Sequence, residues 1–298
     1  MIESINLSID AGIELEVDGI GKLALLEHIR TGGSATVWTA QDDDGKLFAV
    51  KVHRARRNSD QHELDISRES TCIAEHPNIC GCIGSGIIEL SDDRRCHSLV
   101  FPLFEHDELA DYMHEDLTGT RKIDLLSIHT KISVCAKIIE GIGAIHEAGW
   151  LHGDISLRNI LYDADSEELR IIDFEFSRPV DESPGDGQIN RGTREYTAPE
   201  VDIHGIKAAS ESSDVWAVGL LLAYILDSST EEYLRDIGGW RQWKEQYDST
   251  VPILPEFSLK EVPTELWQYI RQCTIINRDK RPSINELSGV FNDYLESD

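Results

Sequence analysis

Two carboxylates and an amide in the second half of the chain have a spacing that suits chemistry at oxygen atoms. The segment from His152 to Asn159 contains Asp154, and about fourteen residues after Asn159 an apolar run ends in Asp173. Carboxylate and amide oxygens ligate hard cations such as Mg2+, which makes Asn159 and Asp173 candidate metal ligands. Asp154 is a candidate for orienting a hydroxyl group and accepting its proton. Each acid alone is more often a turn residue or a helix cap, so the combination carries the prediction.

A second group of candidate residues lies in the first half of the chain. Gly32 and Gly33 stand between two strand-like runs, where small residues let backbone N–H groups approach phosphate oxygens. Taken alone, this pattern also fits a Gly-Gly hairpin turn. Lys51 follows Ala49 and Val50 in an apolar strand. Most strand lysines face solvent, and an inward-facing ammonium group would need an anionic partner to offset its desolvation.

The elements that must position these residues change in type along the chain. Alternating and β-branched runs predict strands over residues 23–29, 36–40, 47–53, 83–89 and 96–103, and one amphipathic helix over residues 60–75. After Glu105 the apolar residues recur with the helical period. They form a broad apolar stripe from Ile132 to Ile145, and Gly149 ends this helical segment. The apolar run from Val215 to Leu226 suits a buried helix and is too short to span a bilayer.

The sequence therefore predicts an α+β fold of two lobes. A small antiparallel β-sheet lobe with one helix occupies residues 21–104, and a larger, mainly helical lobe occupies residues 105–298. We expect the two lobes to form a single domain over residues 21–295. Residues 1–20 are an N-terminal extension, and about twenty residues at the start look dispensable.

Charge and cysteine usage limit the partners and the compartment. The 298 residues include 28 Lys and Arg against 55 Asp and Glu, a formal charge of −27, which argues against nucleic acid and against an anionic membrane surface. The six cysteines show neither a disulfide framework nor paired CxxC motifs, so we expect buried thiols and a reducing compartment; a metal site of Cys80 and Cys82 with Cys96 or His97 is the less favoured alternative. The start, MIESINLSID, has no secretory signal, which favours an intracellular protein, cytoplasmic or nuclear.

These motifs, taken in order, resemble the eukaryotic-type protein kinase family from about Leu25 to Leu295. The Gly-rich loop corresponds to residues 30–37, the strand lysine to Lys51, the catalytic loop to residues 152–159 and the magnesium-binding aspartate to Asp173. Residues 192–200 are similar to the GTxxYxAPE end of the activation segment, residues 214–219 to DxWxxG, and Arg281-Pro282 to the late RP pair.

The resemblance implies a fold that closes over ATP, with Mg2+ as cofactor, and transfer of the γ-phosphate to a protein serine or threonine hydroxyl. Lys51 would hold the α- and β-phosphates, with Glu69 as its helix partner and Glu63 as the alternative. The implied catalytic residues are Asp154, Lys51, Arg158, Asn159 and Asp173, of which Asn159 and Asp173 hold the metal. The implied nucleotide-binding residues are Gly32, Gly33, Val37, Ala49, Lys51, Glu69, Phe101, Pro102, Phe104 and Leu161.

Residues 99–105 resemble the hinge of the family. Phe101 stands at the gatekeeper position, and the resemblance implies that the Pro102 carbonyl and the backbone of Phe104 face adenine. Val37, Ala49 and Leu161 would sandwich the base. In the larger lobe, the resemblance implies a buried salt bridge between Glu200 and Arg281 and anchoring of the catalytic-loop backbone by Asp214.

Three departures from the family pattern carry expectations of their own. Arg30 and Ala35 replace the first and third glycines of the loop, which predicts weaker ATP binding. Gly153 replaces the arginine that normally binds an activation-loop phosphate, so we expect basal activity that needs no such phosphorylation; a large loss on phosphatase treatment would contradict this. Glu175 replaces the glycine after Asp173-Phe174, which predicts restricted switching there.

The acceptor class and the function have competing interpretations. Ser156 stands where serine/threonine kinases carry a lysine, and Arg158 has the tyrosine-kinase placement. Gly192-Thr193 favours serine/threonine acceptors and is given more weight, because the resemblance implies that this threonine contacts the catalytic aspartate, Asp154. The rival functions are a pseudokinase scaffold that binds nucleotide without efficient transfer, and a small-molecule kinase of the aminoglycoside or choline type. The net charge suggests a basic protein substrate.

Overall fold

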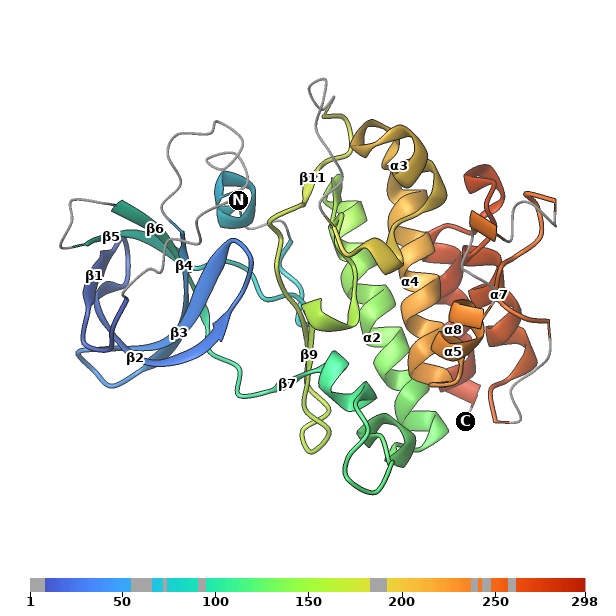
Figure 1. Cartoon of the computed structure of the whole chain (residues 1–298), viewed down its shortest axis with the longest axis horizontal. Coiled ribbons are helices and arrows are strands. Elements are labelled where there is room, and N and C mark those ends of the chain that lie inside the picture. The colour runs from blue at the N-terminus through green and yellow to red at the C-terminus, as the bar shows by residue number, and fades with distance from the viewer. Residues whose placement is uncertain are drawn as a thin grey trace. The chain divides into compact units, whose positions relative to one another are not determined.

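The computed structural model describes residues 9–54, 66–71, 74–90, 95–182, 192–236, 241–242, 248–256 and 261–297. The chain forms two compact units, the first within residues 1–72 and 80–105 and the second within residues 73–79 and 106–298. Strands build the first unit and helices build most of the second (Figure 1). The predicted α+β fold, with a small antiparallel sheet and one helical segment followed by a mainly helical part, is confirmed.

Six antiparallel strands of the first unit close into a barrel in the order β1-β2-β3-β4-β6-β5. The strands are β1 (Glu14–Val17), β2 (Gly21–Thr31), β3 (Ala35–Asp42), β4 (Leu47–His53), β5 (Gly84–Glu89) and β6 (Arg95–Pro102). Because side chains alternate along a strand, every second residue enters the barrel. The interior is apolar and includes Leu15, Val17, Leu23, Leu25, Trp38, Ala40, Phe48, Val50, Val52, Ile88, Cys96 and Val100. The five strands predicted from the sequence correspond to β2 through β6.

The start of the chain differs from the expectation. Strand β1 pairs with β2 along its whole length and with β5 at Val17 and Gly86, so the segment expected to be dispensable contributes a barrel strand. Gly86 is required for this closure, because a Cβ there would lie 2.6 Å from the carbonyl oxygen of Glu16. A strand of four residues carries too little alternation to be recognised from its sequence.

The helix predicted over residues 60–75 is described only in part. Residues 66–70 are helical, and residues 74 and 75 are not. Residues 60–65 and 72–73 lie outside the described residues, and so does the alternative lysine partner Glu63. Glu69 lies within the helical segment 66–70, and its side chain is buried.

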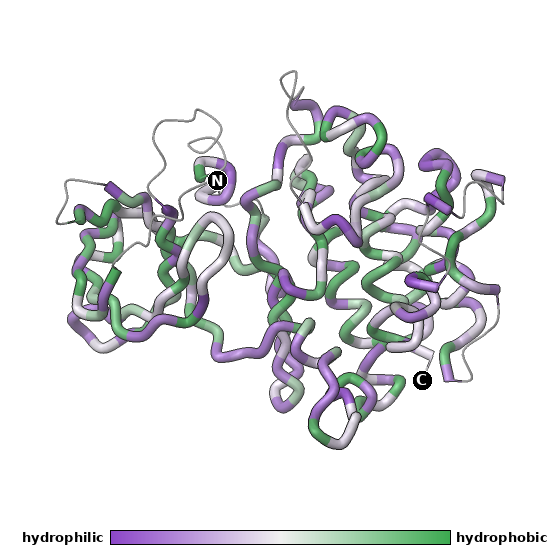
Figure 2. Tube along the Cα trace, in the orientation of Figure 1, coloured by the Kyte–Doolittle hydropathy of each residue, from purple (hydrophilic) through white to green (hydrophobic). Residues whose placement is uncertain are grey.

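Helices α2 (Ile128–Glu147) and α4 (Glu211–Leu226) pack side by side at the centre of the second unit (Figure 1). Ser127 caps α2 by accepting a hydrogen bond from the backbone N–H of Thr130, and α2 ends before Gly149, as predicted. Both helices are hydrophobic along most of their length (Figure 2). Their burial corresponds to this composition, since α2 buries a broad stripe and α4 is buried on nearly all sides.

The remaining elements of the second unit surround this pair. In the described residues, the other helices with complete bounds are α3 (Pro199–His204), α5 (Thr230–Asp236), α7 (Thr264–Cys273) and α8 (Ile284–Ser297). Short 3-10 helices are η1 (Leu109–Met113), η2 (Lys122–Leu125), η3 (Leu157–Asn159), η4 (Arg194–Tyr196), η5 (Ile206–Ala208) and η6 (Arg278–Lys280). Short strands form two small sheets. One has the strand order β10 (Leu169–Ile171), β9 (Ile160–Tyr162) and β7 (Asp107–Glu108), and the other pairs β11 (Arg178–Pro179) with β8 (Trp150–Leu151). Gly219 lets α7 approach α4 closely, since a Cβ there would lie 2.4 Å from the Cβ of Cys273.

The cysteine side chains are mostly buried. Cys80, Cys96, Cys135 and Cys273 are buried and Cys82 is half-buried, while Cys72 lies outside the described residues. Burial raises the pKa of the Cys273 thiol to about 12. The expectation of buried thiols is confirmed for these four. No helix in the described part of the chain has the length and apolar character needed to cross a membrane.

Candidate active site

The first unit gathers its candidate residues on one face of the sheet formed by β3, β4 and β6. In the antiparallel register, Val37 lies opposite Lys51 and Lys51 opposite Leu99, and Ala49 lies opposite Phe101. Paired residues share a face, and residues two apart on a strand also share it. Val50 and Val52 enter the barrel core, so Val37, Ala49, Lys51 and Phe101 lie on the opposite face.

Lys51 and Glu69 form an ion pair on this face. The Lys51 Nζ lies 2.6 Å from the Glu69 Oε1, and the two side chains are 12% and 1% exposed. A buried carboxylate next to an ammonium group offsets much of the desolvation of both charges. The lysine partner expected from the sequence is therefore the one that the structure brings into contact.

The loop between β2 and β3 is a tight hairpin. Arg30 pairs with Val37 and Thr31 with Thr36, and the Gly32 N–H donates to the carbonyl oxygen of Ala35. A Cβ on Gly33 would meet no atom within 4 Å, so this glycine leaves the tip open rather than filling a tight space. The Arg54 guanidinium group donates to the Gly32 carbonyl at 3.0 Å and ties the tip to the end of β4. The two interpretations of Gly32 and Gly33, a hairpin turn and an open loop at which N–H groups could approach phosphate, are therefore compatible with one another.

The segment compared with a hinge begins at the end of β6. Pro102, the last residue of β6, lies opposite Phe48 in the register, and Phe104 is half-buried two residues later. Pro102 has no N–H, and its carbonyl remains available as an acceptor. Leu161 belongs to the second unit, where it lies in β9 opposite Arg170 and Glu108.

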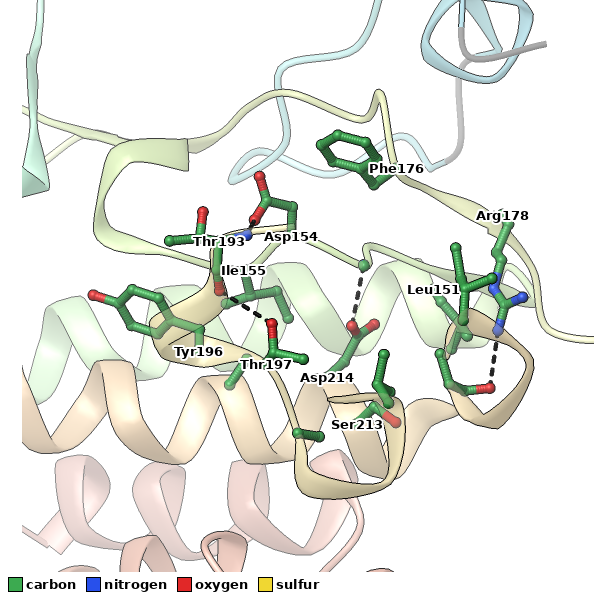
Figure 3. Close-up of a pocket in the computed structure, with 16 residues that line it drawn as sticks. Leu151, Asp154, Ile155, Phe176, Arg178, Thr193, Tyr196, Thr197, Ser213 and Asp214 are labelled. Carbon is green, nitrogen blue, oxygen red and sulfur yellow. Dashed lines mark hydrogen bonds between the residues drawn. The ribbon is translucent and has the colours of Figure 1, made fainter. Parts of the chain in front are cut away.

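In the second unit, the carboxylate of Asp154 is held by two donors. Its Oδ1 accepts a hydrogen bond of 2.6 Å from the backbone N–H of Thr193 (Figure 3). Its Oδ2 accepts one of 3.0 Å from the Asn159 side-chain amide. The same amide also donates to the Asp154 carbonyl at 2.7 Å. The family resemblance implies a contact of Thr193 with Asp154, and in the structure the backbone N–H of Thr193 makes this contact.

Asn159 and Asp173 lie at the ends of neighbouring chain segments. The Ile172 N–H donates to the Asn159 carbonyl, and β10 pairs with β9 directly before Asp173. Since the Asn159 Nδ2 faces Asp154, the amide oxygen is the end left for a cation. Asp173 has a φ of 66°, an unusual backbone conformation that clusters at functional sites. One carboxylate and one amide oxygen are a donor set that fits Mg2+.

A buried aspartate of α4 fixes the start of the loop of residues 152–159. The Asp214 Oδ2 accepts hydrogen bonds from the His152 N–H at 2.9 Å and the His146 Nε2 at 3.0 Å, and its Oδ1 accepts one from the Gly153 N–H at 3.1 Å. Burial alone raises the pKa of this carboxyl group, but the His146 hydrogen bond and the charges of His146 and His152 outweigh it, so the pKa lies below its ordinary value. Asp214 therefore anchors the loop backbone, as expected from the sequence.

The aspartate-phenylalanine segment packs on the same loop. The ring of His152 lies 5.1 Å from the ring of Phe174, and the Ser177 N–H and hydroxyl both donate to the Phe174 carbonyl, which closes a turn over residues 174–177. Glu175 is half-buried in this turn and does not have a positive φ, so the backbone here does not require the glycine that the family carries.

A cavity of about 40 Å³ lies beside Asp154 in the second unit (Figure 3). Its wall includes Thr193 and Tyr196 from the segment before α3, Phe176 from the turn, and Arg178, whose guanidinium group donates to the Ala209 carbonyl. The volume suffices for a few water molecules and is far below the several hundred Å³ of a typical ligand pocket. This cavity is therefore not a nucleotide site.

Gly153, the residue in place of the family's arginine, occupies a position that excludes a side chain. Its φ is +78°, and a Cβ would lie 2.6 Å from the carbonyl oxygen of Phe176. We expect Gly153→Ala to lower the free energy of unfolding by more than the ~1–2 kcal/mol of the left-handed conformation alone, because a backbone carbonyl must also move. Chemical denaturation measures this difference.

Gly149→Ala is the matched control for that prediction. Gly149 has the same φ of +78°, and a Cβ there would meet nothing within 4 Å, so it isolates the backbone term. Equal destabilisation by the two substitutions would show that Phe176 yields without cost and that Gly153 has no steric role.

A second buried ion pair supports the segment after Thr193. Arg281 donates from two nitrogens to the two carboxylate oxygens of Glu200, both at 2.8 Å, and its guanidinium carbon lies 4.9 Å from the centre of the Trp216 ring. The Ser213 hydroxyl also donates to Glu200. The salt bridge expected between Glu200 and Arg281 is present.

Arg158 was predicted as a site residue, and in the described part of the chain its exposed side chain makes no hydrogen bond or ion pair.

Three residues near the candidate site, His146, His53 and Arg54, were not predicted from the sequence. The spacing of two between Lys51 and His53 is a signal that could have identified His53 as sharing a strand face with Lys51. The sequence carries no signal of this kind for His146.

The sequence of this chain is similar to those of known proteins. The model of the protein kinase domain family matches residues 23–290. The chain is similar to serine/threonine-protein kinase PkaB of Streptomyces coelicolor, with 25% identity over 279 residues, 89% of this chain and 61% of that protein. It is also similar to ribosomal protein S6 kinase alpha-4 of Mus musculus, with 29% identity over 190 residues, 62% of this chain and 22% of that protein. The chain thus spans less than two thirds of the length of either relative.

Proposed function

Because the chain belongs to the protein kinase domain family, we propose that it is an ATP-dependent protein kinase that transfers the γ-phosphate to a serine or threonine hydroxyl. The observation that carries this proposal is the Asp154 carboxylate, held at one oxygen by the Thr193 N–H and at the other by the Asn159 amide. A pre-positioned carboxylate of this kind is what orientation and deprotonation of an acceptor hydroxyl require.

The first unit supplies nucleotide-binding groups in this proposal. Lys51, oriented by Glu69, holds the α- and β-phosphates, and the open tip at Gly32 and Gly33 offers backbone N–H groups to phosphate oxygens. The adenine contacts are the Pro102 carbonyl and the Phe104 backbone. Apolar contact from the first unit comes from Val37, Ala49 and Phe101, and the apolar contact assigned to the second unit is Leu161.

The second unit supplies the metal ligands and the base. Asn159 and Asp173 would hold Mg2+, which when bound neutralises charge on the phosphate oxygens. Each oxygen of Asp154 already accepts one hydrogen bond and keeps lone pairs for the acceptor hydroxyl. As the acceptor oxygen forms its bond to the γ-phosphorus, its proton passes to Asp154, and the bond from the γ-phosphorus to the β-γ bridging oxygen breaks to release ADP. Arg158 is exposed beside Asn159 and offers positive charge to the phosphate.

The acceptor and regulation belong to the same proposal. The contact of Thr193 with Asp154 supports serine/threonine acceptors, and the charge of −27 supports basic protein substrates. The absence of a side chain at Gly153 supports activity without activation-loop phosphorylation. We place the protein in the cytoplasm or nucleus, and we treat residues 21–295 as one catalytic domain with lobes of residues 21–104 and 105–298.

The proposal is tested by transfer of labelled γ-phosphate from ATP with Mg2+ onto basic, acidic and tyrosine-containing peptides. Transfer to basic serine and threonine peptides, lost on chelation of Mg2+, is the expected result. Binding of ATP without transfer to any acceptor would indicate a pseudokinase scaffold instead. Transfer to an aminoglycoside or to choline, but to no peptide, would indicate a small-molecule kinase.

A further inference from the structure

His53 lies on the same face of β4 as Lys51. The two residues are separated by Val52, which enters the barrel core, so both of their side chains point away from that core. His53 is the last residue of β4 and lies opposite Ala35 in the register. Its side chain is 1% exposed, which makes it a buried titratable group that the proposed transfer reaction does not use.

The ring of His53 contacts the carboxylate that pairs with Lys51. The His53 Nε2 lies 3.5 Å from the Glu69 Oε2, whereas the Lys51 Nζ lies 2.6 Å from the Glu69 Oε1. In the described part of the chain, these two residues are the ion-pair partners of Glu69. Each oxygen of a carboxylate that is 1% exposed therefore faces a different nitrogen from one strand.

The arrangement restrains how the Glu69 carboxylate can turn. With Lys51 alone, the carboxylate could rotate about its terminal bond and leave either oxygen buried away from a nitrogen, which is costly for a charged group. A ring nitrogen next to Oε2 favours the one orientation in which Oε1 faces Lys51. The rigid ring of His53 also loses less conformational entropy on contact than a lysine or an arginine would.

We propose that His53 is a positioning residue, which holds Glu69 so that Glu69 in turn holds Lys51 in place for the nucleotide. The proposal rests on the proposed function in assigning nucleotide binding to Lys51, and it adds a residue that acts through Glu69. His53 does not touch the nucleotide in this proposal. The effect of its removal must therefore depend on the presence of Glu69.

A double-mutant cycle tests this dependence in the full chain. We expect His53→Leu to lower kcat/KM for ATP about tenfold, because a displaced binding group costs orders of magnitude in rate. His53→Gln should retain activity to within about threefold, since its amide nitrogen reaches the position of the ring Nε2. In a Glu69→Gln background, His53→Leu should have no further effect. His97→Leu, which alters an exposed histidine of β6 in the same unit, is the control and should match the unmodified chain.

A second measurement does not require phosphoryl transfer. An amine-reactive reagent labels Lys51 at a rate set by how firmly its Nζ is held, and mass spectrometry of the labelled peptide gives that rate. We expect His53→Leu and Glu69→Gln each to accelerate labelling severalfold, and His53→Gln to leave it near the original rate. If the unmodified chain transfers no phosphate, the proposed function fails and this labelling still decides the role of His53.

Any of three results would overturn the proposal. The first is that the losses in kcat/KM caused by His53→Leu and Glu69→Gln are additive. The second is that His53→Gln lowers kcat/KM as much as His53→Leu does, and the third is that the labelling rate of Lys51 is unchanged in His53→Leu. Circular dichroism confirms folding before each measurement. If the leucine variant does not fold, His53→Asn takes its place with the same expected results, because its amide is too short to reach the Glu69 Oε2.

Discussion

Replacement of Asp154 by asparagine is expected to reduce the rate of phosphoryl transfer by a factor of about 10² to 10⁴, the usual contribution of a general base. The substitution keeps the shape of the side chain but removes the charge that accepts the proton. It also places an amide N–H2 group next to the Asn159 amide or the Thr193 N–H, both of which donate hydrogen bonds to Asp154. The measurement is the initial rate of labelled phosphate transfer to the best peptide acceptor.

The affinity for ATP separates a catalytic loss from a binding loss. Lys51 and Glu69 are unchanged in this variant, so the dissociation constant of a fluorescent ATP analogue should stay within about twofold. Asp165→Asn is the control, because Asp165 is an exposed carboxylate in the turn between β9 and β10. An Asp154→Asn variant that keeps more than a tenth of the original rate would contradict the assignment of Asp154 as the base.

The second large effect is expected on stability, from Asp214→Asn. Three donors converge on this buried carboxylate, from the backbone of His152 and Gly153 and from the ring of His146. An asparagine there must turn its N–H2 group toward at least one of these donors. Breaking a buried network of this kind costs about 3–5 kcal/mol, which we expect as the loss in the free energy of unfolding in chemical denaturation. Activity should fall with it, because the catalytic loop loses its anchor.

The pH dependence of that loss has a definite sign. Burial raises the Asp214 pKa, and the His146 hydrogen bond and nearby charges bring it below the ordinary value of 3.8 in the folded state. A depressed pKa contributes stability that is fully present above the unfolded-state value and disappears as the pH falls through the folded-state value. The difference between the original chain and Asp214→Asn should therefore shrink below about pH 4.

A matched substitution checks this interpretation. Asp111 is an exposed carboxylate of the same unit, and Asp111→Asn removes the same formal charge without removing a buried network. Its unfolding free energy should change by less than about 0.5 kcal/mol at every pH. A loss in Asp214→Asn that is constant down to pH 3 would show that the Asp214 carboxylate is not the titrating group.

Much of the site could be predicted from the sequence because its residues lie close together along the chain. Asp154 and Asn159 are five residues apart, and a loop of that length keeps the amide within reach of the carboxylate. The apolar and β-branched residues over 47–53 similarly predicted strand β4, which contains Lys51. Apolar residues over nearly every position of 215–226 predicted the buried helix α4.

Contacts between distant residues were harder to predict. His146 and Asp214 are separated by 68 residues, and their contact depends on how α2 and α4 pack. The sequence associated Thr193 with Asp154, but the structure shows that the backbone N–H makes the contact. The short strand β1 was missed because its strongest signals, the glycines of β5 that make room for it, lie about seventy residues away.

The sequence by itself determined the two-part α+β architecture and the identities of the candidate site residues, and it limited the pairing partner of Lys51 to Glu69 or Glu63, of which the structure shows Glu69 in contact. Only the tertiary structure decided that His53 shares the carboxylate of Glu69 and that Gly153 must lack a side chain beneath the Phe176 carbonyl. The physical reason is the range of the forces involved. Periodicity and loop spacing reflect local backbone geometry, which every short window of sequence contains. The space around a side chain is set by elements that pack against it from elsewhere in the chain.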